Sequence, residues 1–259
     1  MIDEHLPELI NSVSEATQRN LPETSKEVDD ALATVIAFFN NVILYPMKKA
    51  NISFKYKLES FKEDFEQKVI DIPNEYLQEP PLMIAGPTLE ALKYTYDEKE
   101  LRDMYENLLA SAMDTRKAYQ VHPSYVDAIK QMSPLDACVL ERIVDLWPLP
   151  CATVQVSSDE YGILPEYYVS ELSDISNPFN VSVSISNLSR LGLIDNLEIP
   201  LSGTDYRSII SDSFFAERIN LTSAAPHKVK ILKRTITLND YGKDFAEICL
   251  SPKETNHAD

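Results

Sequence analysis

Glycine, cysteine and histidine are all scarce in this chain of 259 residues, which contains 5, 3 and 4 of them. A backbone with so few glycines has little means of wrapping closely around a nucleotide phosphate, and the sequence contains no glycine-rich phosphate loop and no Gly-x-Ser-x-Gly turn. The three cysteines, Cys138, Cys151 and Cys249, are odd in number and far apart, which argues against a disulfide framework. No two histidines stand three or four residues apart, so we expect neither a metal site nor a cofactor.

Positive charge is also in short supply, because 24 lysines and arginines face 41 aspartates and glutamates and leave a net charge of −17. A field of this sign repels nucleic-acid phosphates and anionic lipid surfaces, so nucleic acid is a disfavoured partner. Near the amino terminus, Asp3, Glu4 and Glu8 stand where a secretory signal would carry lysine or arginine before an apolar run. We therefore expect a cytoplasmic protein.

Helical periodicity dominates the first half of the chain. A capping box at Thr24-x-x-Glu27 predicts a helix up to Pro46 that is apolar on nearly every side. Its stretch 31–47 is just long enough to cross a bilayer, so two interpretations stay open: a central core helix, which we favour, or membrane association. Two further amphipathic helices are predicted, the second beginning at Asp97-x-x-Glu100. Their apolar positions are Leu58, Phe61, Phe65 and Val69, then Leu101, Met104, Tyr105, Leu108, Leu109 and Ala112.

Two prolines that follow polar residues predict the starts of two more helices. They are Pro123 after His122, and Pro134 after Ser133, where Asp136 completes a capping pattern. The second of these helices should end near Trp147, because Pro148 cannot continue it. We predict the domain boundary just before this helix, with an amino-terminal segment 1–24, a helical domain 25–132, a smaller domain 133–250 and a tail 251–259.

The smaller domain shows a different pattern. We predict a helix or loop over 166–175, a helix over 181–191 that ends at Gly192, strands over 193–199 and 229–238, and a last helix that Asn239 or Asp240 opens. This order looks like a winged helix-turn-helix. The predicted fold is mostly α (α+β): an amino-terminal helical bundle followed by a smaller winged-helix-like domain with a short antiparallel sheet.

Short motifs in a fixed order give the chain a resemblance to a known family. They are Ile72-Pro73, Glu79-Pro80, Leu101-Arg102-Asp103-Met104, Asn107-Leu108-Leu109-Ala110, His122-Pro123-Ser124-Tyr125-Val126 and Gln131-Met132-Ser133-Pro134. On these motifs the sequence resembles the Abi-alpha (abortive infection alpha) family of bacteria. The resemblance implies a role in phage resistance, without a known chemistry, and it marks Pro73, Pro80, Asn107, Leu108, His122, Pro123 and Pro134 as family-motif positions.

We predict that the protein acts through contact with a protein partner or a phage component, with a homo-oligomer as an alternative. The candidate surface combines the exposed positions of the 181–191 helix with basic residues on the last strand. Its members are Ser186, Asn187, Arg190, Lys230, Lys233 and Arg234. One arginine brings little phosphate neutralisation, so protein contact is favoured over a DNA-binding regulator.

One enzymatic alternative rests on spacing alone. Arg116 and His122 are separated by five residues, similar to the Arg-x4-6-His motif of the HEPN superfamily of helical ribonucleases. Here, however, His122 precedes a proline, where its ring is better placed to hydrogen-bond the backbone at the start of a helix. We therefore expect a protein that is not an enzyme.

Overall fold

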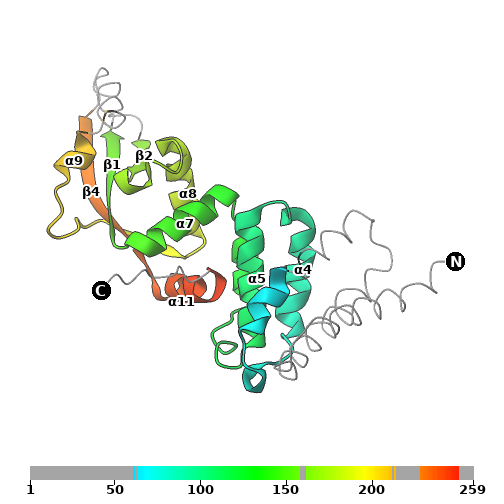
Figure 1. Ribbon diagram of the computed structural model, residues 1–259. Coiled ribbons are helices and arrows are strands. Elements are labelled where there is room, and N and C mark those ends of the chain that lie inside the picture. Colours follow the sequence, from blue (N-terminus) through cyan, green and yellow to red (C-terminus); the bar gives the residue numbers. More distant parts are fainter. Residues whose placement is uncertain (1–60, 62–63, 158–161, 212, 214–227, 251–259) are drawn as a thin grey trace.

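A computed structural model describes residues 61, 64–157, 162–211, 213 and 228–250 (Figure 1). The first half of this range is helical. In the second half, helices alternate along the chain with the strands of one antiparallel sheet. The elements are η2 (Asn74–Tyr76), α4 (Leu82–Thr95), α5 (Lys99–Met113), α6 (Ser124–Lys130), α7 (Pro134–Leu146), β1 (Leu149–Ser157), β2 (Gly162–Tyr168), η3 (Ser170–Leu172), α8 (Pro178–Arg190), β3 (Ile194–Leu197), α9 (Arg207–Ile210), β4 (Lys228–Leu238) and α11 (Asp240–Cys249).

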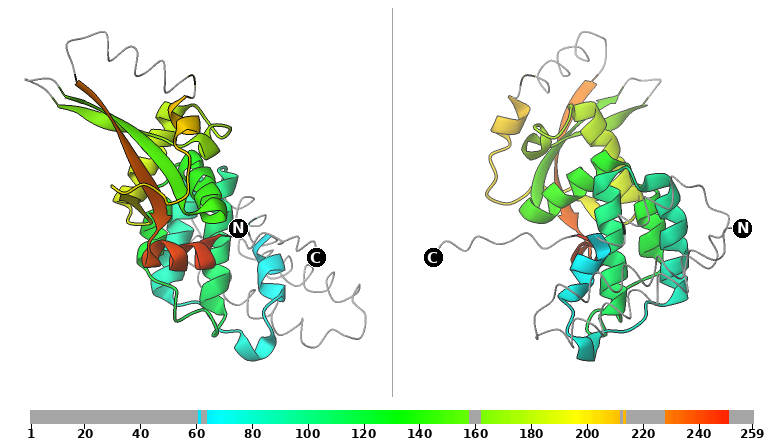
Figure 2. Two further views of the ribbon diagram at one scale, coloured as in Figure 1. Left: turned by 90° about the vertical axis from the view of Figure 1, so that its left-hand side faces the viewer. Right: turned by 45° about the vertical axis from the view of Figure 1, so that its right-hand side comes forward.

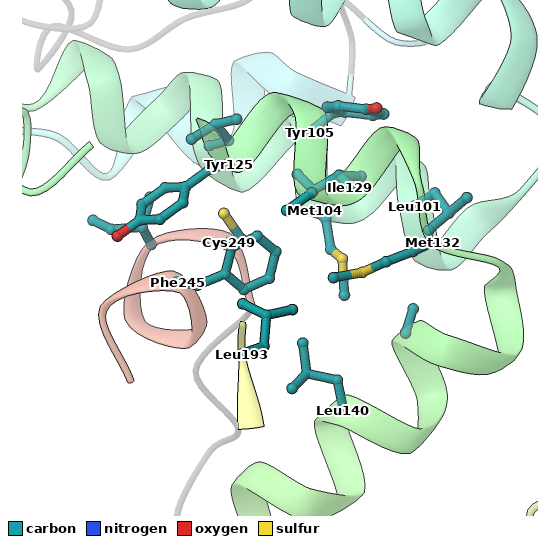
Figure 3. Close-up of a cluster of buried hydrophobic side chains, with 14 of the residues drawn as sticks. Leu101, Met104, Tyr105, Tyr125, Ile129, Met132, Leu140, Leu193, Phe245 and Cys249 are labelled. Atoms are coloured by element: carbon teal, nitrogen blue, oxygen red, sulfur yellow. The ribbon is translucent and has the colours of Figure 1, made fainter. Parts of the chain in front are cut away.

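Helix α5 lies at the centre of the helical region and packs against α4, α6, α7 and α11 (Figures 1 and 2). Its apolar positions were predicted correctly, since Leu101, Met104, Leu108 and Leu109 are almost completely buried. Figure 3 shows how side chains from α5, α6, α7 and α11 meet beside Leu193, which comes directly before β3. The start of α5 was predicted wrongly. Its N-cap is Glu98, one residue after Asp97, and no side chain caps it.

The sheet has the strand order β2-β1-β4-β3, with every neighbouring pair antiparallel. The predictions of strands over 193–199 and 229–238 are confirmed by β3 and β4. The prediction of a helix or loop over 166–175 was only partly right, because this segment begins with the end of β2 and continues into η3. Strand β1 was missed, although Thr153, Val154 and Val156 are residues that favour strands.

The two faces of the sheet are covered by different elements. Leu149, Cys151 and Ile236 belong to the main hydrophobic core, to which α7 and α8 also contribute. On the other face, Ala152 and Tyr168 pack with Tyr206 and Ile209 into a small separate cluster around α9. Adjacent residues in a strand point to opposite faces, which is why Cys151 and Ala152 belong to different clusters.

Helix termini in this region follow the sequence signals. Ser133 and Asp136 form the predicted capping box of α7, and Asn239 caps α11 through its side chain. Helix α8 begins at Pro178, three residues earlier than predicted, because Asn177 supplies an N-cap. Gly192 adopts φ 74° directly after α8, a backbone conformation that side chains other than glycine rarely accept.

Glycine is required at one further position for a different reason. Gly242 of α11 lies so close to Leu193 that a methyl group at its Cβ position would clash with the Leu193 carbonyl oxygen. Asn239 donates to the neighbouring carbonyl of Gly192 at 2.8 Å, so α11 is held tightly against the turn between α8 and β3. The backbone of this turn therefore fixes where α11 can lie.

One main hydrophobic cluster runs from Phe61 to Cys249 and includes residues on both sides of the predicted boundary at 132/133. The division into two domains itself stays a prediction. Of the predicted helix with Leu58, Phe61, Phe65 and Val69, residues 64–70 are helical, and the last three apolar side chains are buried. The predicted helix up to Pro46, the segment 1–24 and the tail 251–259 lie outside the described residues.

Candidate functional site

Helix α8 uses most of its polar side chains to hold its own position. Asn187 donates through Nδ2 to the Gln131 carbonyl at 3.1 Å and to Asp136 Oδ2 at 3.0 Å. Arg190 donates to Asn187 Oδ1 at 2.8 Å and to Gln131 Oε1 at 3.0 Å. These bonds fasten the end of α8 to the turn between α6 and α7. Two residues of the predicted interaction surface are therefore bonded to other residues of the chain, although Arg190 itself is exposed.

The outward side of α8 carries two apolar side chains beside polar ones such as Asn180 and Ser189. Phe179 is 45% exposed and Val183, one helical turn later, is 68% exposed. Ser186 continues the same face, and its hydroxyl donates to the Ser182 carbonyl of its own helix at 2.9 Å. The remaining branched side chains of α8, Val181, Ile185 and Leu188, are buried in the core. Phe179, Val183 and Ser186 are called the α8 face below.

The basic residues of β4 do not form one surface. Lys233 pairs with Ala152, whereas Arg234 pairs with Cys151, so the two side chains point to opposite faces of the sheet. Arg234 is buried and donates to Glu198 Oε1 at 2.7 Å. The Lys233 ammonium group lies 5.4 Å from the centre of the Tyr206 ring. Lys230 is exposed. The predicted cluster is thus divided, and Arg234 has a structural role.

Among the family-motif positions, Asn107 connects three parts of the chain. It donates to the Cys249 carbonyl at 3.0 Å and accepts from Lys68 Nζ at 2.7 Å, while Ser111, one turn later on α5, donates to the Ile248 carbonyl at 3.1 Å. The last carbonyl groups of a helix have no partner within the helix, so these side chains satisfy the end of α11. Leu108 is fully buried beside them.

The prolines of the family motifs mark where elements begin. Pro73 precedes η2, Pro123 precedes α6, and Pro134 is the first residue of α7. Pro80 is buried just ahead of α4, which the sequence analysis did not predict and which contains Pro87. These positions shape the helical region and place no reactive group at a common site.

His122 and Arg116 are each engaged locally. The His122 ring accepts from the Ser124 backbone N–H at 3.2 Å, the bond to the following helix that the sequence analysis predicted. The predicted position of the helix start was wrong by one residue, because Pro123 is the N-cap of α6 and not its first residue. The Arg116 guanidinium binds Asp114 with both Nε and Nη2, and it lies 4.7 Å from the centre of the Tyr76 ring. This contact holds the pKa of the Asp114 carboxyl below its usual range. Arg116 and His122 therefore both make local contacts that stabilise the chain around them.

A second candidate site is a cavity of about 560 Å³ between α5, α7 and α11. Apolar atoms of Met104, Val144, Leu238, Ala246 and Leu250 contribute to its wall. Five carboxylate residues, Glu100, Asp103, Glu141, Asp145 and Glu247, line it as well, together with Lys117 and Lys243. The chain's single tryptophan, Trp147, completes the lining and is 41% exposed. Sequence reasoning missed this site, because its carboxylates come from three separate helices.

Neighbouring charges around α5 also act on buried groups. Burial, followed by the Glu100 and Glu141 carboxylates, raises the pKa of the Cys138 thiol, so carboxylates of α5 and α7 act on the same atom. Glu106, which is 2% exposed, has its pKa raised to about 7, with burial as the largest cause. The nitrogens of Lys68 and Arg102 lie 3.7 Å from its carboxylate oxygens and oppose that rise.

Within the part of the chain that the structure describes, no group of three or more histidine, cysteine or acidic side chains is arranged to hold a metal ion. In the same residues, no helix combines the length and the apolar character needed to cross a bilayer. The segment 31–47, on which the membrane alternative rests, lies outside them.

Comparison with known proteins gives one family. No curated protein matches the sequence. One solved structure is similar, that of an uncharacterized protein from the hydrocarbon-degrading marine bacterium Alcanivorax borkumensis SK2. The match covers 53% of this chain and 96% of the other chain, with 15% sequence identity and a TM-score of 0.37. The model of the abortive infection alpha family matches residues 53–249. The chain therefore belongs to the abortive infection alpha family, and this membership suggests a role in defence against phage.

Proposed function

We propose that this protein acts in phage defence without catalysis, by binding another protein through the α8 face. The observation that carries the proposal is the exposure of Phe179 and Val183, one turn apart, on a helix whose other branched side chains are buried. Apolar side chains leave water favourably when a partner covers them, and aromatic residues are enriched at the centres of protein interfaces. A phage component or a host protein is the expected partner.

DNA recognition is a poorer explanation of the same helix. A helix that reads DNA brings cations to the phosphates and polar side chains to the base edges. The only basic residue of α8 is Arg190, and its guanidinium is already bonded to Asn187 and Gln131. The α8 face offers a phenyl ring and an isopropyl group instead. Together with the net charge of −17, this composition favours a protein surface as the partner.

We also propose that residues 133–250 form a winged-helix-like domain in a cytoplasmic protein. Support comes from the element order α7, β1, α8, β3, β4, with β4 between β1 and β3 in the sheet. In such a domain α8 takes the position of the recognition helix. The hairpin partner β2 is an addition to that pattern, and its residue Tyr167 is tied to α8 by an N–H bond to Ser182 Oγ at 2.9 Å.

The experiment is a plaque assay with a phage panel on cells that express the full chain or the double variant Phe179→Ser, Val183→Ser. Both side chains are exposed, so the variant should fold like the wild type and lose protection against those phages that the wild type restricts. Circular dichroism and thermal unfolding of the purified variants confirm the fold.

The matched control is Met83→Ser, Tyr94→Ser on α4. These two side chains are 62% and 79% exposed, so the control removes a similar amount of exposed apolar surface elsewhere. Protection should survive in the control. If the α8 variant is folded and still protects fully, the α8 face is not the binding site and the proposal is wrong.

A further inference from the structure

The cavity between α5, α7 and α11 combines two kinds of lining that suit one kind of ligand group. Its apolar wall can cover an aliphatic stem, and its carboxylates can receive a positive charge at the end of that stem. Asp103 of α5 and Glu247 of α11 enter no salt bridge or hydrogen bond with any other described residue, although Lys117 and Lys243 line the same cavity. Five carboxylates against two ammonium groups leave an excess of negative charge there.

We propose that this cavity binds an arginine side chain presented by a basic segment of a partner protein. Arginine fits because its three methylenes can lie along the apolar wall while its planar guanidinium bonds carboxylates in a fork geometry. Charge complementarity identifies the class of partner, since an acidic cavity in a protein of net charge −17 attracts cations over a distance.

Trp147 and Lys243 already display the type of contact involved. The Lys243 ammonium group lies 5.3 Å from the centre of the Trp147 ring and 3.1 Å from Asp240 Oδ1. A cation is therefore accepted over this ring face, as the negative face of an indole predicts. An incoming guanidinium binds the carboxylates. The Lys243 ammonium group competes with this guanidinium for the Trp147 ring and repels it, because both groups are positively charged. Lys243 thus limits the affinity of the site.

The test uses the sole tryptophan as a reporter. The full chain is titrated with the synthetic peptide Gly-Arg-Gly-Arg-Gly, blocked at both ends, while the emission of Trp147 is recorded. We expect a saturable change in emission. The same peptide with citrulline in place of arginine keeps the shape but not the charge, and it should give no saturable change. Loss of the response to arginine, or an equal response to citrulline, overturns the proposal.

Two pairs of substitutions that change the net charge equally distinguish binding in the cavity from attraction by the net charge of the whole protein. Asp103→Asn with Glu247→Gln should weaken binding about ten-fold, equivalent to about 1.4 kcal/mol. Asp71→Asn with Glu79→Gln changes net charge equally at exposed positions outside the cavity lining and should leave the affinity within about two-fold. Equal weakening by both pairs means diffuse attraction and overturns the assignment of this cavity.

A third variant tests the part played by Lys243. Lys243→Gln removes a like charge from the cavity and frees the Trp147 ring, so the arginine peptide should bind a few-fold more tightly. Unchanged or weaker binding contradicts the site geometry. None of these measurements involves phage, so the outcome is independent of the proposed binding through the α8 face.

Discussion

Helices α5 and α8 are both amphipathic and both bury apolar side chains, but α8 also exposes large apolar side chains, which α5 does not. In α5, polar Asn107 and Ser111 are directed to the end of α11 and satisfy its carbonyl groups, and the apolar positions are buried. In α8, the polar residues near the carboxyl end are bonded within the molecule, and apolar Phe179 and Val183 face outward. Exposed apolar groups contribute little to folding, so stability explains the apolar positions of α5, whereas the exposed pair of α8 is what the proposed binding would account for.

The comparison is tested most strongly by truncating one leucine or valine in each helix. Leu108→Ala in α5 removes a side chain with no exposed surface and should lower the free energy of unfolding by about 2–5 kcal/mol. Val183→Ala in α8 should change stability by less than about 0.5 kcal/mol, because that side chain is 68% exposed. Denaturant unfolding measures both. Similar losses in the two variants would remove the distinction between the helices.

A second test uses Glu106, the buried acidic residue of α5, for which α8 has no counterpart. The pKa of Glu106 is raised from its ordinary 4.5 to about 7, so the folded chain holds this proton more tightly than the unfolded chain. The free energy of unfolding should therefore fall as pH rises from about 4.5 to about 7, by an amount on the order of 3 kcal/mol. Glu106→Gln should remove this part of the pH dependence and be the more stable protein at pH 8.

Thermal unfolding at pH 5 and pH 8 separates the two outcomes for Glu106. The matched control is Glu100→Gln, which removes a partly exposed carboxylate of the same helix that does not act on the Glu106 pKa, and it should retain the wild-type slope. A Glu106→Gln protein with the same pH dependence as the wild type would show that this carboxyl is not the group responsible. Helix α8 has no acidic residue, so it contributes no comparable titration.

The smallest expected effect concerns Arg190 on α8. Arg190→Ala removes the bonds to Asn187 and Gln131, but these lie in solvent, so the loss should stay below about 1 kcal/mol. Protection against phage should persist, because the guanidinium is not part of the α8 face. A plaque assay together with a melting curve measures both properties. Loss of protection by a stable Arg190→Ala protein would extend the binding surface to the end of the helix.

The helices were predictable where local signals agree with packing. The spacing of Leu101, Met104 and Leu108 identified α5, and the Ser133 and Asp136 pair identified the start of α7. Helix α4 and strands β1 and β2 were missed, since Pro87 interrupts the helical pattern and Pro150 and Pro165 interrupt the strand patterns. Their pairing partners are far away in sequence, as when Cys151 pairs with Arg234, and local patterns do not contain that information.

The sequence by itself determined the acidic character of the protein, its helical periodicities and its family, because composition and short motifs are local properties. Tertiary structure alone decided which exposed residues share a surface. It placed Lys233 and Arg234 on opposite faces of the sheet and bonded Arg190 to Gln131. It also left Phe179 and Val183 exposed. It also gathered carboxylates of α5, α7 and α11 around Trp147. These arrangements depend on long-range packing, which fixes the direction of each side chain only once the elements have met.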